Sequence, residues 1–299
     1  MRAWLGPGLG IALLTCGGEP RPPPYGFAAA PEQHYRFEGE DRTEVDGQQV
    51  HVQRYADIRL VAEAPERGRT EIALYLDRYY VRVEGAPGGT TELALSERGI
   101  ATRTPEQGEL ILGPDAERPG GGPVAELRER PAAGCELGSN GETIGTPWHS
   151  FDPILSGIAL LDWILFGFPV LAPDAANTWS ARRRVPPLGQ YQLGMELGLQ
   201  YERTSSPIEG GQRIRVSGLL QRPTLRIAPD FTGELALDHI GQVELGPEGR
   251  LREARLELRM RFDAESGSLV SSEHVVRIRC LDCTGSINSP PQAPDISKE

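Results

Sequence analysis

Cysteine is the residue type in this chain most able to do chemistry, and two of the four cysteines stand close together as Cys280-Leu-Asp-Cys283. This spacing is that of a thiol redox pair. Activation of a thiol needs a helix N-terminus or a cation to lower its pKa, whereas this pair ends a strand pattern and encloses Asp282. We therefore favour a structural bridge from Cys135 to Cys280 or Cys283, which would close a loop of about 145 residues and stabilise the fold by about 4 to 5 kcal/mol. A redox pair, or a metal site that adds His274, are the alternatives.

The remaining chemistry-bearing residues show no pattern that defines an enzyme. Gly138-Ser139-Asn140-Gly141 is shorter than a nucleophile elbow, and Gly120-Gly-Gly-Pro123 lacks the flanking strand and helix of a phosphate-binding loop. The only lysine, Lys298, leaves none inside the fold for a Schiff base. We therefore predict no catalytic residue, no metal and no cofactor. The histidines show neither metal-ligand spacing nor a fixed relation to a serine: His34, His51, His149, His239 and His274.

Composition narrows the class of protein further. The 299 residues include 36 Gly and 26 Pro, which argues against a long helical bundle. The net charge is −11, with 42 acidic and 31 basic residues, which argues against a protein that binds nucleic acid by neutralising phosphates. Arg182-Arg-Arg184 is the basic run of the chain, and we interpret it as an exposed strand end in preference to a contact for lipid headgroups.

The amino terminus points to the cell envelope. Arg2 precedes a short apolar run that is too short to span a membrane and ends in Leu13-Leu14-Thr15-Cys16. This segment resembles a bacterial lipoprotein precursor, although Thr15 departs from the usual Gly, Ala or Ser. The resemblance implies cleavage before Cys16, lipidation of its thiol and new amino group, and, because Gly17 is not Asp, sorting to the outer membrane. The alternative is an ordinary cleaved signal.

Beyond residue 33 the pattern is one of strands. Polar and apolar residues alternate over Gln190 to Glu202 and over Ala254 to Phe262, as expected for antiparallel strands with one solvated face. The apolar phase slips after Leu76, which predicts a bulge near Asp77-Arg78. We therefore predict a mainly β fold of antiparallel curved sheets, a half-barrel or a sandwich. A transmembrane barrel is disfavoured because the polar carboxyl-terminal tail lacks a terminal aromatic strand.

An apolar segment separates the two strand blocks. Asp152-Pro153 and Gly167 with Pro169 are helix start and stop signals, which predicts a helix of about 15 residues. Apolar residues cover most of its circumference, so we expect it to pack on or plug the concave side of the sheet. A lid over an apolar cavity, as in helix-plugged half-barrel envelope proteins that this part loosely resembles, or a surface for a partner protein, are the alternatives. The candidate ligand or lid residues are Leu161, Asp162, Trp163 and Phe166.

These patterns divide the chain into consecutive segments. We expect a signal peptide (1–15), a lipidated Cys16 with a Pro/Gly-rich tether (16–32), a first β block (33–130), a Gly-rich loop with the apolar helix (131–180), a second β block (181–283) and a disordered tail (284–299). The function expected is that of a non-catalytic outer-membrane lipoprotein facing the periplasm or the cell surface and attached to the membrane through its lipid. It would serve as a binding or envelope-assembly module that holds an apolar ligand or a lipid, or contacts an envelope protein partner. The alternative is a periplasmic enzyme, either a thiol-disulfide oxidoreductase using Cys280 and Cys283 or a hydrolase whose residues have no recognised motif.

Overall fold

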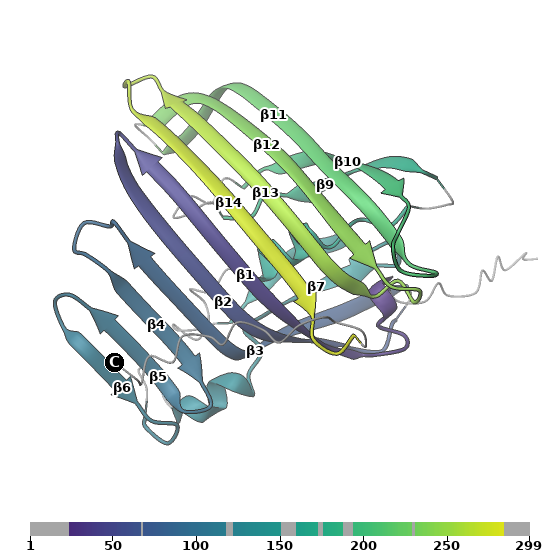
Figure 1. Ribbon diagram of the computed structural model, residues 1–299, viewed down its shortest axis with the longest axis horizontal. Coiled ribbons are helices and arrows are strands. Elements are labelled where there is room, and N and C mark those ends of the chain that lie inside the picture. Colours follow the sequence, from purple (N-terminus) through teal and green to yellow (C-terminus); the bar gives the residue numbers. More distant parts are fainter. Residues whose placement is uncertain are drawn as a thin grey trace, which may run out of the picture.

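The strands of the protein form one open antiparallel sheet, seen in the computed structural model of Figure 1. The structure describes residues 24–66, 68–117, 122–150, 160–172, 176–187, 194–228 and 231–283. Twelve strands follow the order β6-β5-β4-β3-β2-β1-β14-β13-β12-β11-β10-β9, and off this path β7 pairs with β3 and β8 pairs with β7. The predicted mainly β fold with curved antiparallel strands is confirmed.

The elements have the following bounds. The first part of the chain contains β1 (Glu32–Val45), β2 (Gln48–Ala62), β3 (Arg69–Glu84), β4 (Thr91–Ser96), β5 (Gly99–Thr104) and β6 (Gly108–Leu112), with short 3-10 turns η1 (Pro24–Gly26) and η2 (Val124–Arg128). The middle contains β7 (Ala133–Gly138), β8 (Thr143–His149), α1 (Leu160–Gly167) and β9 (Thr178–Arg184). The last part contains β10 (Glu196–Thr204), β11 (Gln212–Ala228), β12 (Phe231–Leu245), β13 (Leu251–Ala264) and β14 (Leu269–Cys280).

The two strand blocks share this sheet because β1 pairs with β14, from Tyr35 opposite Cys280 to Val45 opposite Val270. The alternation expected from the sequence sets which face of each strand is buried. Along β13 the apolar residues from Ala254 to Phe262 lie in the core, and the intervening charged residues point outward. A single core of apolar side chains therefore lines the inner face of both blocks.

The predicted bulge in β3 is present. Asp57 of β2 pairs with Arg78 and its neighbour Ile58 pairs with Leu76, so Asp77 is the extra residue. The bulge divides β3 into two parts with different partners: the residues before it pair with β7, and those after it pair with β4. One strand thus supports both the long sheet and the β7–β8 hairpin.

The segment expected to be a Gly-rich loop contains this β7–β8 hairpin, which corrects the sequence analysis. At two of its glycines a side chain would either clash with a neighbour or strain the backbone. A Cβ on Gly134 would lie 2.4 Å from the ring of Trp148, and Gly141 has a φ of +78° at the turn. The glycines that suggested a loop therefore allow a strand to pass beneath an indole ring and a tight turn to form.

The apolar helix lies against the inner face of the sheet. Helix α1 is described from Leu160 to Gly167, and its predicted start at Asp152 lies outside the described residues. Nearly all of its residues are buried, and it contacts β13, β14 and β9. Gly167 permits the closest approach, because a Cβ there would lie 2.7 Å from Ile278. The helix therefore packs as the expected plug.

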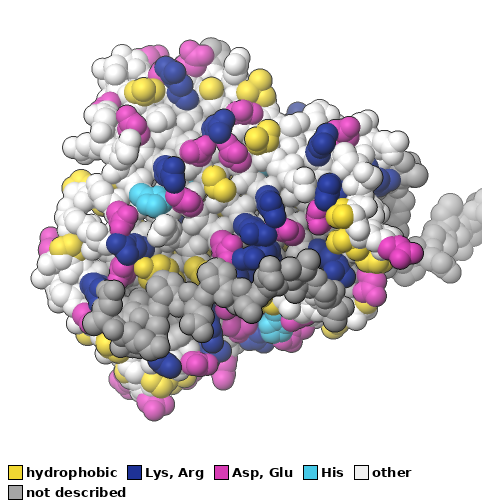
Figure 2. Space-filling model, in the orientation of Figure 1, with side chains coloured by type: hydrophobic (Ala, Val, Ile, Leu, Met, Phe, Trp, Pro, Cys, Tyr) yellow, Lys and Arg dark blue, Asp and Glu magenta, His cyan; other side chains and the backbone are white. Residues whose placement is uncertain are grey.

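The predicted signal peptide, Cys16 and most of the tether lie outside the described residues, as does the tail from residue 284. Within the described part of the chain, no helix has the length and apolar character needed to cross a membrane. Charged residues of both signs are interleaved over the face seen in Figure 2. Outward ion pairs such as Arg259 with Glu273, 3.1 Å apart, contribute to this mixed surface.

Candidate functional site

A cleft of about 840 Å³ lies beside α1, between the edge strand β9 and the β7–β8 hairpin. Part of its lining is apolar and comes from the helix, from the chain that follows it and from the residues before β10: Leu165, Phe166, Val170, Leu171 and Met195. Strand β9 contributes Trp179 and Ala181, which are half-buried and face inward. The volume lies within the range of small-molecule sites in proteins.

Three consecutive arginines line the same cleft, and the strand alternation gives them different environments. Arg182 and Arg184 are exposed, whereas Arg183 is buried, with 4% of its surface accessible. The sequence interpretation of an exposed strand end is therefore right for two of the three residues. The cleft therefore combines an apolar surface with charges of both signs, because Glu142, Asp162 and Glu196 also line it and Glu196 lies opposite Arg184 in the strand register.

Arg183 fixes the geometry of the cleft. Its Nη2 donates hydrogen bonds to the carbonyl oxygens of Phe168, at 2.8 Å, and Gly141, at 3.0 Å. The hydroxyl of Tyr25 donates to the carbonyl oxygen of Pro169 at 2.5 Å and lies 3.3 Å from the same guanidinium nitrogen. Four segments distant in the sequence meet here, and the cation lies at the carboxyl end of α1, where it is electrostatically favoured.

Two of the four predicted ligand or lid residues, Asp162 and Phe166, line this cleft. Leu161 and Trp163 do not line it and are buried elsewhere in the core, with 1% and 3% of their surfaces accessible. The Trp163 ring lies 5.5 Å from that of His274 on β14. Asp162 is 3.9 Å from His149 of β8, so one side of the helix faces the hairpin and another faces the sheet.

The cysteines pair differently from the favoured expectation. Cys280 and Cys283 form a disulfide, and Cys135 is a buried free thiol. The bridge predicted from Cys135 is therefore wrong. Cys135 lies on β7 opposite Ile72 of β3, and burial raises the pKa of its thiol to about 12, which keeps it protonated and unreactive. Sequence reasoning had no means of placing β7 against β3.

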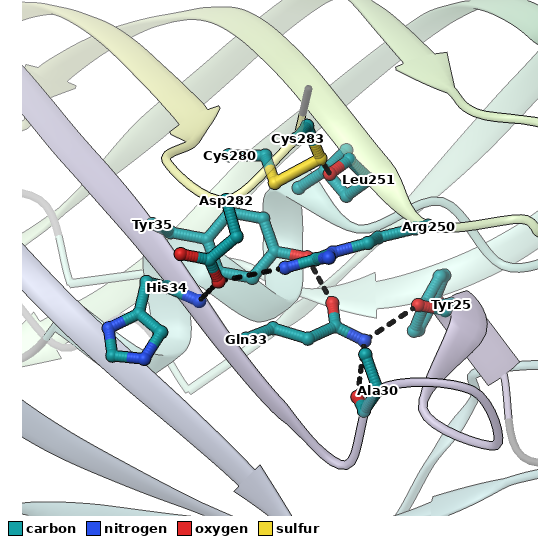
Figure 3. The surroundings of a disulfide bond; sticks show 10 residues. All are labelled: Tyr25, Ala30, Gln33, His34, Tyr35, Arg250, Leu251, Cys280, Asp282 and Cys283. Carbon is teal, nitrogen blue, oxygen red and sulfur yellow. Dashed lines mark hydrogen bonds and ion pairs between the residues drawn. A yellow bond between two sulfur atoms is a disulfide. The ribbon is translucent and has the colours of Figure 1, made fainter.

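The disulfide closes a turn at the end of β14 that is held against β1 (Figure 3). The Asp282 carboxylate, inside the turn, accepts hydrogen bonds from the backbone N–H of His34 at 2.9 Å and from Arg250 at 3.0 Å. The Leu281 N–H donates to the carbonyl oxygen of His34 at 2.8 Å. These contacts give the Cys-Leu-Asp-Cys segment a structural role in joining strand ends.

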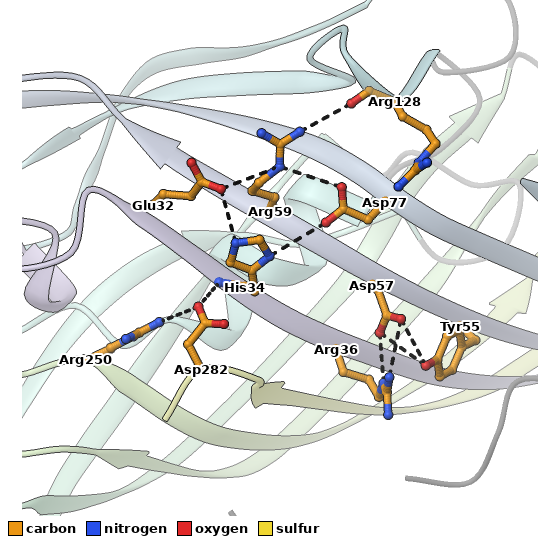
Figure 4. A network of polar contacts seen from close by, with 10 residues as sticks. All are labelled: Glu32, His34, Arg36, Tyr55, Asp57, Arg59, Asp77, Arg128, Arg250 and Asp282. Carbon is orange, nitrogen blue, oxygen red and sulfur yellow. Dashed lines mark hydrogen bonds and ion pairs between the residues drawn. The ribbon is translucent and has the colours of Figure 1, made fainter. Parts of the chain in front are cut away.

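A second polar cluster surrounds the bulge on the outer face (Figure 4). The Asp77 carboxylate lies 3.7 Å from Nε of Arg59 and 3.8 Å from Nδ1 of His34. Arg59 also stacks 4.7 Å from the centre of the Tyr75 ring. Nearby, Arg36 and Asp57 form an ion pair at 2.9 Å. The cluster holds the extra residue of β3 in place, and no group of three or more potential metal ligands was found among the described residues here or elsewhere.

The inner face contains a polar cluster that the sequence analysis missed. Asp41 of β1 lies directly opposite His274 of β14, and their Oδ1 and Nδ1 atoms are 2.8 Å apart. On its other side, Nε2 of His274 is 3.0 Å from Oγ of Ser272. Asp41 also forms an ion pair with Arg54. The available signal was the same-face pair Ser272 and His274, but the partner on β1 could be found only from the strand register.

The comparisons with known proteins leave the chain without a family. No family model and no curated protein matches it. Among solved structures, it resembles lipovitellin, studied for lipid–protein interactions, with a TM-score of 0.43 and 7% identity over 88% of this chain. This match spans 26% of the lipovitellin chain.

Two further structures show weaker likeness. An outer membrane channel from Pseudomonas putida F1 has a TM-score of 0.24 and 10% identity, over 83% of this chain and 94% of that one. A DUF1329 family protein from Desulfovibrio piger has a TM-score of 0.17 and 8% identity, over 87% of this chain and 90% of that one. These similarities are too distant to define a family or a function.

Proposed function

We propose that this protein is an outer-membrane lipoprotein, facing the periplasm or the cell surface, that binds a single-chain anionic amphiphile in the cleft beside α1. The observation behind the proposal is the combination, in one open cleft, of an apolar lining with two exposed arginines, Arg182 and Arg184, beside the carboxylates of Glu142, Asp162 and Glu196. Leu165, Phe166 and Val170 would contact an acyl chain, and Arg182 and Arg184 would pair with an acidic headgroup. Burial of an acyl chain is favourable by about 0.8 kcal/mol per CH₂ group.

The framework around the cleft supports this proposal. Arg183 and Tyr25 tie the end of α1 to the turn at Gly141, so the apolar lining does not depend on ligand for its position. A preformed cleft saves the ligand the cost of ordering its own site. The role is one of binding, and it uses no bond-making step.

Membrane attachment through Cys16 is the second part of the proposal. It is supported by the lipobox-like sequence and by the Pro-rich segment after it, Glu19-Pro-Arg-Pro-Pro-Pro, which would act as a tether. Expression of the full precursor and of its Cys16→Ser variant, followed by membrane fractionation, tests it. We expect the wild type in the outer membrane and the variant in the soluble fraction; unchanged membrane association of the variant would refute lipid anchoring.

Ligand binding is tested on the mature chain with Cys16→Ser. Native mass spectrometry of the freshly purified protein looks for a co-purified lipid, and titration with lysophosphatidylglycerol and lysophosphatidylcholine compares an anionic with a zwitterionic single-chain probe. Ala181→Phe should fill the cleft and weaken binding at least about tenfold, whereas Gln200→Phe, on the outer face of the neighbouring strand β10, should leave it unchanged.

The headgroup contribution is tested separately with Arg182→Glu combined with Arg184→Glu, and Arg215→Glu on the outward side of β11 serves as the charge control. We expect the double variant to lose the preference for the anionic probe. Equal binding of both probes to wild type and Ala181→Phe would show that the cleft is not the site.

A further inference from the structure

The polar cluster on the inner face is built by strand register. Ser272 and His274 are two residues apart on β14 and therefore point to the same face, and Asp41 is the cross-strand neighbour of His274. Most neighbouring inner-face positions are apolar, such as Leu258 opposite His274 on β13 and Met260 opposite Ser272. Aliphatic packing does not require a serine, a histidine and a carboxylate at these three positions.

The contacts place His274 between an acid and a hydroxyl. Asp41 as a carboxylate can only accept, so a hydrogen bond to it would need the ring proton of His274 on Nδ1, which lies 2.8 Å from Oδ1 of Asp41. Nε2 is then an acceptor, and the hydroxyl of Ser272, 3.0 Å away, is the donor. The ring of His274 is fixed from one side by Trp163, 5.5 Å between centres. This is the arrangement in which a histidine can take a proton from a serine.

Arg54 keeps Asp41 in its charged form. It reaches diagonally from β2, where it lies opposite Gly39, to pair with the Asp41 carboxylate. Burial raises the pKa of Asp41, but the contacts with His274 and Arg54 outweigh burial and lower it. Gly39 has no side chain, and a Cβ there would lie 2.9 Å from the ring of Phe37. The buried carboxylate therefore has a defined cation and a defined histidine partner.

Ser272 stands where the inner face changes from buried to half-buried. It is 6% exposed, whereas Thr43, directly opposite on β1, and Val50, beyond it on β2, are half-buried. An apolar acyl group could contact Val50 and Met260 next to the serine. Thr43 places a hydroxyl on the same face opposite Ser272, as a candidate hydrogen-bond donor to a developing oxyanion.

We propose that Ser272 and His274 are catalytic residues for the hydrolysis of esters of apolar acyl chains, with Asp41 as the positioning residue. The oxygen of Ser272 attacks the ester carbonyl while its proton passes to Nε2 of His274, which then gives that proton to the leaving alkoxide. Water attacks the resulting acyl-serine, again losing a proton to Nε2, and the acid departs as Ser272 regains its hydrogen. The products are one carboxylic acid and one alcohol, and no other reactant is needed.

The test uses the mature chain with Cys16→Ser, a fluorophosphonate probe and the p-nitrophenyl esters of butyrate and decanoate. We expect a probe adduct on Ser272, identified by peptide mass spectrometry, and faster hydrolysis of the longer ester. Ser272→Ala should abolish both, whereas Ser271→Ala, whose side chain lies on the outer face of the same strand, should abolish neither. Asp41→Asn should slow labelling at least about 100-fold and alter its pH profile, since the ring proton of His274 would no longer be held at Nδ1.

Absence of an adduct on Ser272 in the folded wild type, or equal reactivity of Ser272→Ala, would overturn the proposal. Circular dichroism establishes folding of each variant, and the site of the wild-type adduct decides the matter if Asp41→Asn fails to fold. Ala181→Phe should keep the labelling, because the cleft and the serine are separate sites. Loss of ligand binding in the cleft and loss of esterase activity are thus distinguishable.

Discussion

Arg183 of β9 donates a hydrogen bond to the carbonyl oxygen of Phe168, at 2.8 Å, just beyond the carboxyl end of α1. Through this contact β9, the edge strand of the sheet, holds α1 against the inner face of the sheet. Buried carbonyl oxygens are costly when they lack a donor. The stability of the helix and the shape of the cleft should therefore depend on one cation.

Replacing this cation should destabilise the whole fold. Arg183→Met leaves the carbonyl oxygens of Phe168 and Gly141 without this donor, and we expect a loss of about 3 kcal/mol or more in the free energy of unfolding. Arg183→Lys should recover only part of the loss, because lysine lacks the planar fork. Urea unfolding followed by tryptophan fluorescence measures the effect. Arg182→Met is the matched control, and a similar loss in that variant would contradict the assigned role.

Trp163 should behave as a core residue. It is 3% exposed and packs on His274 and Phe166, so Trp163→Ala should cost about 3 to 5 kcal/mol of stability. Trp148→Ala, at a site that is 39% exposed, should cost clearly less in the same unfolding experiment. If Trp163→Ala instead keeps full stability, the helix is a lid and not a plug.

Stability should fall with acid because of His239. Burial lowers the pKa of this histidine from its ordinary value near 6.5 to about 4, although the Glu257 carbonyl acts in the opposite direction. Between those values the unfolded chain binds a proton that the folded protein does not, so stability decreases as the pH falls from 6.5 towards 4, by about 3 kcal/mol in all. The pH dependence of unfolding for wild type and His239→Gln measures this difference. If the free energy of unfolding depends on pH in the same way in the two proteins, His239 is not the source of the acid destabilisation.

The cysteines should react according to the pairing found here. In the folded protein, Cys135 should resist iodoacetamide and Cys280 and Cys283 should be recovered as one linked peptide. Reduction, or Cys283→Ser, should lower stability by about 2 kcal/mol, the chain-entropy value for so short a loop. A Cys135→Ala variant should respond to reductant as the wild type does. Recovery of Cys135 in a disulfide-linked peptide would contradict the pairing of Cys280 with Cys283.

The sequence by itself determined the strands, because the alternation of polar and apolar residues that marks a strand is a property of neighbouring residues along the chain. The buried face of β13, the bulge at Asp77 and the apolar character of α1 all follow from neighbouring residues along the chain. Glycine was less informative: at Gly134 and Gly141 the absence of a side chain serves packing within a hairpin, and the same residue type elsewhere marks a loop.

Only the tertiary structure decided which strands meet, and the candidate sites depend on that. Asp41 and His274 are far apart in the sequence and become neighbours through the register of β1 and β14. Cys135 is free because β7 pairs with β3 and not with β14. In the sequence Arg183 is one of three consecutive arginines, and nothing local distinguishes it from its neighbours. In the structure its strand lies at the end of α1, where Arg183 is buried and bonded to Phe168. Alternation reveals the face of a strand, whereas the partner across that face is set by the packing of the whole sheet.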